Sequence, residues 1–378
     1  MIYLNQAATT FPKPQSVYKA HTAALCALPS GQFRSSYGEQ VDVFEACRRK
    51  LGELLEIKEY DRIWFSSGAT DSANAVIYGL GLASSHVITT ATEHNSVLRP
   101  LLNLKEEVRD VTILSCDKIG RINPSDIKAA VRPNTKAVFI NHVSNVTGYV
   151  QNMNILAPIV KELGLLLIVD VSQSAGCIPI YTDKWKVDGL IFTGHKALFG
   201  SQGTGGYYIR KGIEFHPYRF GGTGFDSERI YYDEDFFEYE VGTANTPGFA
   251  GLLAGVEYVL NRGVKTIETK EQKTMTELYK SMEGIHKVIL YGDAKAKMGP
   301  VLSFNIKGFN PGDVAYILQN GYDIVVRTGL HCAPLIHHYM GTKGKGTVRI
   351  SISDLTTTKE INIFLEALIE ICKSAPCT

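Results

Sequence analysis

Two charged side chains stand at the ends of aliphatic runs that the sequence predicts to be buried strands. Lys196 comes shortly after the run 189–192, and Asp170 directly follows the run 165–169. Because a buried ammonium is costly, a lysine in such a place tends to have a lowered pKa, and its neutral amine suits Schiff-base chemistry. A buried carboxylate needs a partner, and a protonated pyridine nitrogen is one candidate. The plain alternatives are a lysine that starts a surface loop and an aspartate in a structural salt bridge.

The elements that must position these side chains alternate between residues 60 and 210. Short β-branched runs take turns with helical stretches, which is typical of a mostly parallel sheet covered by helices. Five of the runs are followed at once by polar, chemically capable residues. These residues are 66–72, His94, Asn145, Asp170 and 193–196. Open α/β sheets place ligands beyond the carboxyl ends of their strands, so we expect one active site at this edge.

A phosphate and a ring have candidate partners in the same region. The small residues 66–72 lie between a strand and a helix predicted over 73–82, where backbone N–H groups and hydroxyls can bind phosphate. An ordinary helix N-cap is the alternative. The glycine-rich run 200–206 precedes a strand instead of a helix, which argues against a dinucleotide loop. Gln173, three residues after Asp170, is placed to hydrogen-bond a ring oxygen. Pyridoxal phosphate (PLP) needs this combination of groups.

In their order along the chain, these residues resemble the cysteine desulfurases of the class V aminotransferase superfamily. The resemblance covers nearly the whole chain and rests on Tyr3-Leu4-Asn5-Gln6-Ala7-Ala8-Thr9-Thr10, Gly68-Ala69-Thr70, His94, Asn145, Asp170 with Gln173, Thr193-Gly194-His195-Lys196 and Arg327-Thr328-Gly329-Leu330-His331-Cys332-Ala333-Pro334. The last segment resembles the group of Suf-type desulfurases and selenocysteine lyases. It differs from the Nif/Isc group, whose cysteine lies in a Ser-rich loop, and its Gly-Leu-His-Cys-Ala-Pro form resembles a less characterised branch.

The resemblance implies the architecture of the PLP-dependent transferases of fold type I. In that α/β fold a large domain with a mostly parallel sheet would comprise residues 13–255, and a smaller α+β domain residues 1–12 and 256–378. The resemblance also implies a homodimer, because Gly242-Thr243-Ala244-Asn245 of a neighbouring subunit would complete the phosphate site.

The resemblance further assigns roles to single residues. Lys196 would form the Schiff base with PLP and move the α-proton, while His94 would stack on the ring whose nitrogen faces Asp170. Ring-oxygen contacts would come from Asn145 and Gln173, and phosphate contacts from Ala69, Thr70, Thr193, His195 and Thr243. The substrate would be bound by Ala7, Asn145, Arg327 and Arg349. Arg349 would hold its carboxylate as a charge-assisted pair.

Cys332 is the cysteine that we expect to do chemistry. The seven cysteines are scattered without any CxxC spacing, so the others are expected to be reduced, small core residues. A thiol attacks as the thiolate, which nearby positive charge and exposure favour, and both Arg327 and His331 lie close in sequence. A buried small residue is the alternative. The resemblance makes Cys332 the acceptor of sulfur in the conversion of L-cysteine to L-alanine, with a persulfide as its product.

Departures from the family pattern leave other functions open. Asn5-Gln6 replaces Asp-Asn, Leu330 replaces a polar residue, and one residue is missing between Ala333 and Pro334. The alternatives are a selenocysteine or cysteine-sulfinate β-lyase, a transamination or epimerisation with Cys332 as a spectator, and a PLP-binding protein without turnover. A metal site of His331, Cys332, His337 and His338 is a remote alternative, because adjacent histidines point apart on a helix. We therefore expect no metal.

Composition limits the class of protein. The chain has 378 residues, 44% of them hydrophobic, which is enough for two domains. Its 39 basic and 38 acidic residues nearly balance, so nucleic acid is not expected as a partner. The N-terminus lacks the pattern of a secretory signal, and no run approaches the roughly 18 apolar residues of a membrane span. We expect a cytoplasmic enzyme, not membrane-bound, that acts on a small molecule and passes sulfur to an acceptor protein.

Overall fold

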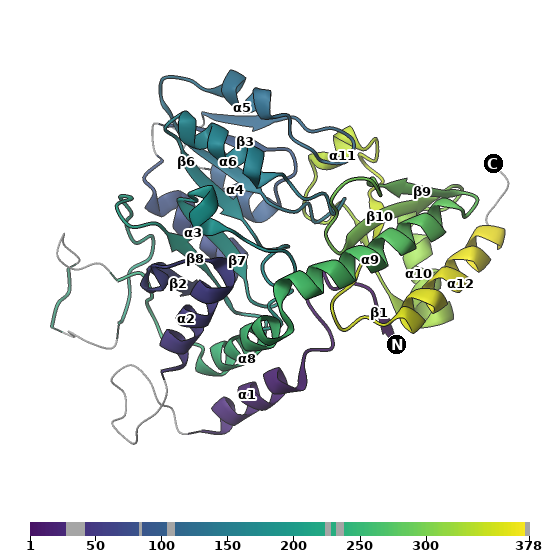
Figure 1. Cartoon of the computed structure of the whole chain (residues 1–378), viewed down its shortest axis with the longest axis horizontal. Helices are drawn as coiled ribbons and strands as arrows, with labels where there is room; N and C mark the ends of the chain where they lie inside the picture. Colours follow the sequence, from purple (N-terminus) through teal and green to yellow (C-terminus); the bar gives the residue numbers. More distant parts are fainter. Residues whose placement is uncertain (28–41, 83–84, 104–109, 224–227, 232–237, 375–378) are drawn as a thin grey trace.

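Two units lie side by side in the computed structural model, which describes residues 1–27, 42–82, 85–103, 110–223, 228–231 and 238–374 (Figure 1). The larger unit is built on a seven-stranded sheet of described residues, in the order β2-β8-β7-β6-β5-β3-β4. Its strands are β2 (Ile63–Ser66), β3 (His86–Thr90), β4 (Val111–Leu114), β5 (Thr135–Asn141), β6 (Leu166–Asp170), β7 (Gly189–Thr193) and β8 (Gly205–Ile209).

The sheet is mostly parallel, as the sequence predicts. Strand β8 runs antiparallel to both β2 and β7, and the remaining neighbours pair in parallel. Because β8 reverses the direction twice, β2 runs the same way as β7. The carboxyl ends of β2, β3, β5, β6 and β7 therefore meet at one edge, and the functional side chains follow these ends.

Helices cover both faces of this sheet, which explains why central strands such as β6 and β7 are apolar along most of their length. Alternate residues of β5 show the arrangement: Ala137 and Phe139 pack in the core under α3 (Ala69–Gly79) and α4 (Asn95–Leu102). Val138 and Ile140 pack on the opposite face. The helices on that face include α2 (Val43–Leu55), α6 (Met153–Glu162) and α8 (Thr246–Arg262). Further elements of this unit are α1 (Gln15–Cys26), η1 (Tyr60–Arg62), α5 (Pro124–Ala130) and α7 (Thr182–Trp185).

The smaller unit holds an antiparallel sheet in the order β12-β13-β10-β9. Its elements are α9 (Val264–Glu283), β9 (Val288–Tyr291), β10 (Val301–Ile306), α10 (Pro311–Tyr322), β11 (Ile324–Val325), β12 (Arg327–Gly329), α11 (Ile336–Tyr339), β13 (Thr347–Ser351) and α12 (Thr358–Ser374). The N-terminal strand β1 (Ile2–Tyr3) pairs in parallel with β11, and the following Leu4 is fully buried in the core of this unit. The domain division at residues 12/13 and 255/256 stays a prediction.

Several boundaries differ from those expected. The helix expected over 73–82 begins at Ala69, so the small residues after β2 form its first turn. The strand expected over 323–326 is shortened to β11, because Asp323 ends α10 with a left-handed φ of 55° and the chain passes to the other sheet when β12 begins at Arg327. The predicted interruption near residues 261–263 is confirmed, since Gly263 with φ 80° separates α8 from α9. None of the helices formed by the described residues is sufficiently long and apolar to cross a membrane.

Candidate active site

A cavity of ≈290 Å³ lies at the edge where the parallel strands end. All the predicted site residues except Cys332 and Thr243 line it. Those that line it are Ala7, Ala69, Thr70, His94, Asn145, Asp170, Gln173, Thr193, His195, Lys196, Arg327 and Arg349. The sheet edge thus brings together side chains that are up to 342 positions apart, between Ala7 and Arg349. The smaller unit contributes the two arginines.

The first turn of α3 forms one end of the cavity. Gly68 precedes the helix with a φ of 143°, and no described side chain caps the helix. The backbone N–H groups of the first turn, at Ala69 and Thr70, are therefore left for a ligand. Gly205 of β8 passes close behind, because a Cβ built there would lie 2.6 Å from the Gly68 Cα. This end of the cavity is suited to an anion, and Thr193 lies beside it.

Lys196 and Asp170 form the centre of the site. Burial lowers the pKa of Lys196 to about 8, against the opposing charge of Asp170 and with a contribution from Arg349. Burial raises the pKa of Asp170, whereas hydrogen bonds from Ser172 and the charge of Lys196 lower it. The backbone N–H of Ser172 donates to Asp170 Oδ1 at 2.8 Å. A lysine with this pKa supplies a substantial fraction of neutral amine close to neutral pH.

Two histidines of the cavity are neutral. Burial, reinforced by the charge of Lys196, lowers the pKa of His94 to about 3 and that of His195 to about 4. His94 is also the N-cap of α4, since its Nδ1 accepts the backbone N–H of Ser96 at 3.0 Å. An uncharged imidazole held in this way presents a flat face, which suits stacking on a ring rather than proton transfer.

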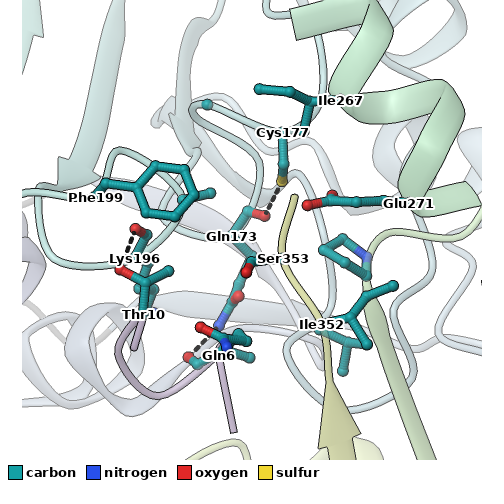
Figure 2. Close-up of a pocket in the computed structure, with 15 residues that line it drawn as sticks. Gln6, Thr10, Gln173, Cys177, Lys196, Phe199, Ile267, Glu271, Ile352 and Ser353 are labelled. Carbon is teal, nitrogen blue, oxygen red and sulfur yellow. Dashed lines mark hydrogen bonds between the residues drawn. The ribbon is translucent and has the colours of Figure 1, made fainter. Parts of the chain in front are cut away.

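The N-terminal segment is hydrogen-bonded to two residues of the site, as Figure 2 shows beside a second cavity. Thr10 donates through Oγ1 to the Lys196 carbonyl at 3.0 Å, and Gln173 donates through Nε2 to the Ala7 carbonyl at 3.1 Å. Lys196 and Gln173 also line a second cavity of ≈20 Å³, on which Glu271 of α9 borders. The segment before α1 therefore helps to fix Lys196 and Gln173 in position next to the smaller unit.

Two arginines supply positive charge without a described carboxylate to neutralise it. Arg349 is 1% exposed, and it donates through Nη1 to the Asn145 carbonyl at 3.0 Å and through Nη2 to Asn5 Oδ1 at 3.2 Å. Burial lowers its pKa to about 9, and the neighbouring Arg327 contributes to this shift. Arg327 pairs with Arg349 in the register of β12 and β13. In the described part of the chain neither forms an ion pair, so the pair is available for a small carboxylate ligand.

Cys332 lies beside the cavity and not in its wall. Its side chain is partly buried, and Arg327 donates through Nη2 to its sulfur at 3.4 Å. The sulfur is near enough that its negative charge would raise the pKa of Lys196 and of Arg349. Arg327 therefore connects the predicted thiol to the site. Both His331 and Cys332 have left-handed backbones, with φ of 52° and 58°.

Thr243 and the histidine pair after Cys332 lie apart from the cavity. Thr243, expected to serve a neighbouring subunit, is exposed and does not line the cavity of its own chain. His337 is buried and His338 exposed, so they face opposite sides of α11. No group of three or more His, Cys, Asp or Glu among the described residues is arranged to hold a metal ion.

Several residues that line the cavity were given no role from the sequence, namely Ser96, Asn141 and Ser172. Ser67, Gly68 and Asp71, which belong to the predicted phosphate segment 66–72, line it as well, and so does His331. Most of them follow the same strand ends as the predicted residues, so that rule applied to every polar position would have found them. Glu93, directly before His94, is fully buried next to the site, and burial raises its pKa to about 8 with a contribution from Asp170. Its position after β3 is the signal in the sequence.

Comparisons with known proteins agree with this architecture. The family model described as Aminotransferase class-V matches residues 2–364. A probable cysteine desulfurase of Methanothermobacter thermautotrophicus is 34% identical over 380 residues, covering 98% of this chain and 94% of that protein. Another, of Pyrococcus abyssi, is 32% identical over 343 residues, covering 88% of this chain and 84% of that protein.

A solved structure extends the agreement to three dimensions. The apo structure of a cysteine desulfurase from Thermococcus onnurineus NA1 has a TM-score of 0.87 and 29% identity, with coverage of 98% of this chain and 94% of that one. The predicted fold type I is thereby confirmed. This chain belongs to the class-V aminotransferase family, in its cysteine desulfurase group.

Proposed function

We propose that this protein is a PLP-dependent cysteine desulfurase, which converts L-cysteine to L-alanine and places the sulfur on Cys332. One observation carries the proposal: Arg327 reaches from the wall of the Lys196 cavity to the Cys332 sulfur at 3.4 Å. Arg327, which can bind an anion, thus lies next to both Lys196, whose pKa is lowered, and the Cys332 thiol. The names of the relatives support the same activity.

The residues of the cavity fit PLP. Several buried polar atoms of residues that line the cavity, among them Asn145 Oδ1 and His195 Nδ1, have no hydrogen-bond partner in the described structure. Buried polar atoms are nearly always paired, so these atoms favour a polar ligand in the cavity. The uncapped first turn of α3 adds backbone donors for a phosphate.

Each residue would hold a different part of the cofactor. Lys196 would hold the aldehyde carbon, Asp170 would face the pyridine nitrogen, and His94 would stack on the ring. Asn145 and Gln173 would contact the ring oxygen. The phosphate would be bound by Ala69, Thr70, Thr193, His195 and, in a homodimer, Thr243 of a second copy. When bound, PLP supplies an electron sink that weakens the bonds at the α-carbon and β-carbon of an amino acid.

The remaining chemistry belongs to the side chains of the protein. Arg349, aided by Arg327 and Ala7, would bind the cysteine carboxylate. Lys196 would take the α-proton and return a proton to carbon, since its amine is partly neutral near pH 8. The Cys332 thiolate would attack the substrate sulfur, so that an S–S bond forms while the substrate C–S bond breaks. The electron pair of that bond stays with carbon, which is protonated to yield alanine, and Cys332 keeps the persulfide for an acceptor protein.

A substrate panel tests the proposal. The holoenzyme and its Cys332→Ala variant are assayed with cysteine, selenocysteine, cysteine sulfinate and alanine, and alanine, sulfide and selenide are measured. Cys26→Ala is the matched control, because Cys26 is an exposed thiol on α1, away from the cavity. We expect Cys332→Ala to keep the yellow colour of the bound cofactor and to lose sulfide release from cysteine, whereas Cys26→Ala behaves as wild type.

The same panel separates the alternatives. Sulfide release by Cys332→Ala at the wild-type rate would exclude the thiol as sulfur acceptor. Turnover of selenocysteine or cysteine sulfinate, but not of cysteine, would make the protein a β-lyase instead. A colourless protein from which borohydride and mass spectrometry recover no cofactor on Lys196 would exclude PLP.

A further inference from the structure

We propose that His331 is a positioning residue for the Cys332 thiol: locked by Thr347 and Asn145, it holds the two residues in the left-handed turn that places the sulfur against Arg327. The inference deepens the proposed function, because an effect of His331 on turnover requires that Cys332 is the nucleophile. An effect of His331 on the accessibility of the Cys332 thiol does not depend on the proposed function.

The turn is strained, so something must hold it. His331 and Cys332 have φ of 52° and 58°, and two consecutive left-handed residues that are not glycine are uncommon. Such a backbone is energetically unfavourable and persists only where its surroundings enforce it. Because the turn lies next to the cavity, the contacts that hold it also fix the position of the thiol relative to the site.

Two hydrogen bonds restrain the carbonyl groups of the turn. Asn145 donates through Nδ2 to the His331 carbonyl at 2.7 Å, and the backbone N–H of Asn95 donates to the Cys332 carbonyl at 2.7 Å. Asn145 is in the wall of the cavity, and Asn95 directly follows His94. The turn is thus fastened to the larger unit by the segments that carry the cofactor-facing side chains.

A third hydrogen bond fixes the imidazole. His331 is 2% exposed, and its Nε2 is 2.9 Å from Thr347 Oγ1. Burial, with the charge of Arg349, lowers its pKa to about 2, so the ring is neutral throughout the working range of an enzyme. A ring that does not change its charge is unsuited to proton transfer and suited to a fixed support.

The position of Thr347 explains how the support reaches the thiol. Thr347 pairs with Gly329 in the register of β12 and β13, and Arg327 pairs with Arg349 on the same two strands. The Thr347 hydroxyl therefore belongs to the same two-stranded unit as both arginines. With His331 locked to this unit, the Cys332 sulfur is held at 3.4 Å from Arg327 Nη2.

Thr347 is the residue to change, because it does not line the cavity. Thr347→Val removes the hydroxyl and keeps the branched shape, while Thr347→Ser keeps the hydroxyl. The holoenzyme variants are compared by kcat and KM for cysteine, and by the rate at which iodoacetamide labels Cys332, read by mass spectrometry. Labelling of the exposed Cys26 serves as the internal reference.

We expect Thr347→Val to lower kcat by about tenfold, the effect of a barrier roughly 1.4 kcal/mol higher, with little change in KM. The rate of Cys332 labelling should change by several-fold while the rate of Cys26 labelling stays constant. Thr347→Ser should restore both kcat and the rate of Cys332 labelling. His331→Asn, which tolerates the left-handed backbone but lacks the reach to Thr347, should repeat the Val result.

Two results would overturn the inference. One is Thr347→Val with wild-type kcat and wild-type Cys332 labelling. The other is Thr347→Ser as impaired as Thr347→Val, which would assign the effect to shape instead of the hydroxyl. If Cys332→Ala releases sulfide normally, the proposed function fails, and the labelling rates alone still decide whether Thr347 and His331 fix the thiol.

Discussion

The side chain of Glu93 accepts the backbone N–H of Asn141 at 2.6 Å, and Asn141 stands opposite Asp170 in the register of β5 and β6. Two buried carboxyl groups therefore share one end of the sheet. Burial raises the pKa of both groups, that of Glu93 to about 8 with a contribution from the charge of Asp170, and only at Asp170 does a lysine, Lys196, together with hydrogen bonds from Ser172, favour the charged form. Near neutral pH the proton belongs on Glu93, which leaves Asp170 as the anion for a cationic partner.

This distribution predicts how the stability of the apoprotein depends on pH. Between the ordinary value of 4.5 and about 8, the unfolded chain has lost the Glu93 proton and the folded chain retains it. Because the folded state then binds more protons, the free energy of unfolding falls as the pH rises through this window. Glu93→Gln keeps an acceptor for Asn141 and removes the ionisation.

The melting temperature of Glu93→Gln relative to wild type should thus rise from about pH 5 to about pH 8. Thermal unfolding of both apoproteins in matched buffers measures the difference. A gap that is the same at both ends of the range would show that Glu93 ionises in the folded state as readily as in the unfolded state.

The pKa of Lys196 predicts the pH dependence of cofactor uptake. Only the neutral amine attacks an aldehyde, and burial lowers the pKa of this lysine to about 8. The rate at which apoprotein takes up PLP should therefore rise with pH and level off above about 8. Stopped-flow absorbance gives the rate, with Lys196→Ala as the control that develops no reducible adduct. A rate that goes on rising steeply with pH up to about 10, as for a lysine of ordinary pKa, would contradict the lowered pKa.

Arg349 is expected to act on substrate binding. It is buried, and it is held by Asn145 and Asn5 without a described carboxylate partner. A charge-assisted hydrogen bond is worth about 1.5–3 kcal/mol, so Arg349→Ala should raise KM for cysteine by roughly 10–100-fold. Arg349→Lys keeps the charge but loses the fork geometry of the guanidinium group, so its KM should lie between those of the wild type and Arg349→Ala. Steady-state kinetics decide, and an unchanged KM in the Ala variant would assign the carboxylate to another residue.

Much of the larger unit can be predicted from the sequence because each central strand is a buried apolar run with polar residues at its end. β6 and β7 are such runs, and their partners Asp170 and Lys196 follow from the same pattern. The smaller unit is harder to predict. β1 has only two residues, and β9 is at best half-buried, so neither has the burial pattern of a core strand.

The left-handed turn of His331 and Cys332 shows where local sequence signals end. Neither His331 nor Cys332 is a glycine, so nothing local indicates a left-handed backbone there. The turn exists because Asn145, nearly 190 residues away, and Thr347 on another strand hold it. Contacts between distant segments, not propensity, decide this part of the site.

The close approach of β8 to the first turn of α3 gives a last prediction. A Cβ added to Gly205 would lie 2.6 Å from the Gly68 Cα and 2.9 Å from the Phe192 carbonyl oxygen, and both are backbone atoms. Overpacking of this kind costs about 1–3 kcal/mol. Because Gly68 precedes the uncapped turn of α3, Gly205→Ala should displace the proposed phosphate site.

We expect Gly205→Ala to lower the melting temperature and to weaken PLP binding by about tenfold, which corresponds to roughly 1.4 kcal/mol. Gly321→Ala is the matched control, because the same methyl group there, on α10, meets nothing within 4 Å. Titration of each apoprotein with PLP, followed by absorbance and thermal unfolding, separates the two effects. If Gly205→Ala is destabilised but binds PLP as tightly as Gly321→Ala, the first turn of α3 does not hold the phosphate.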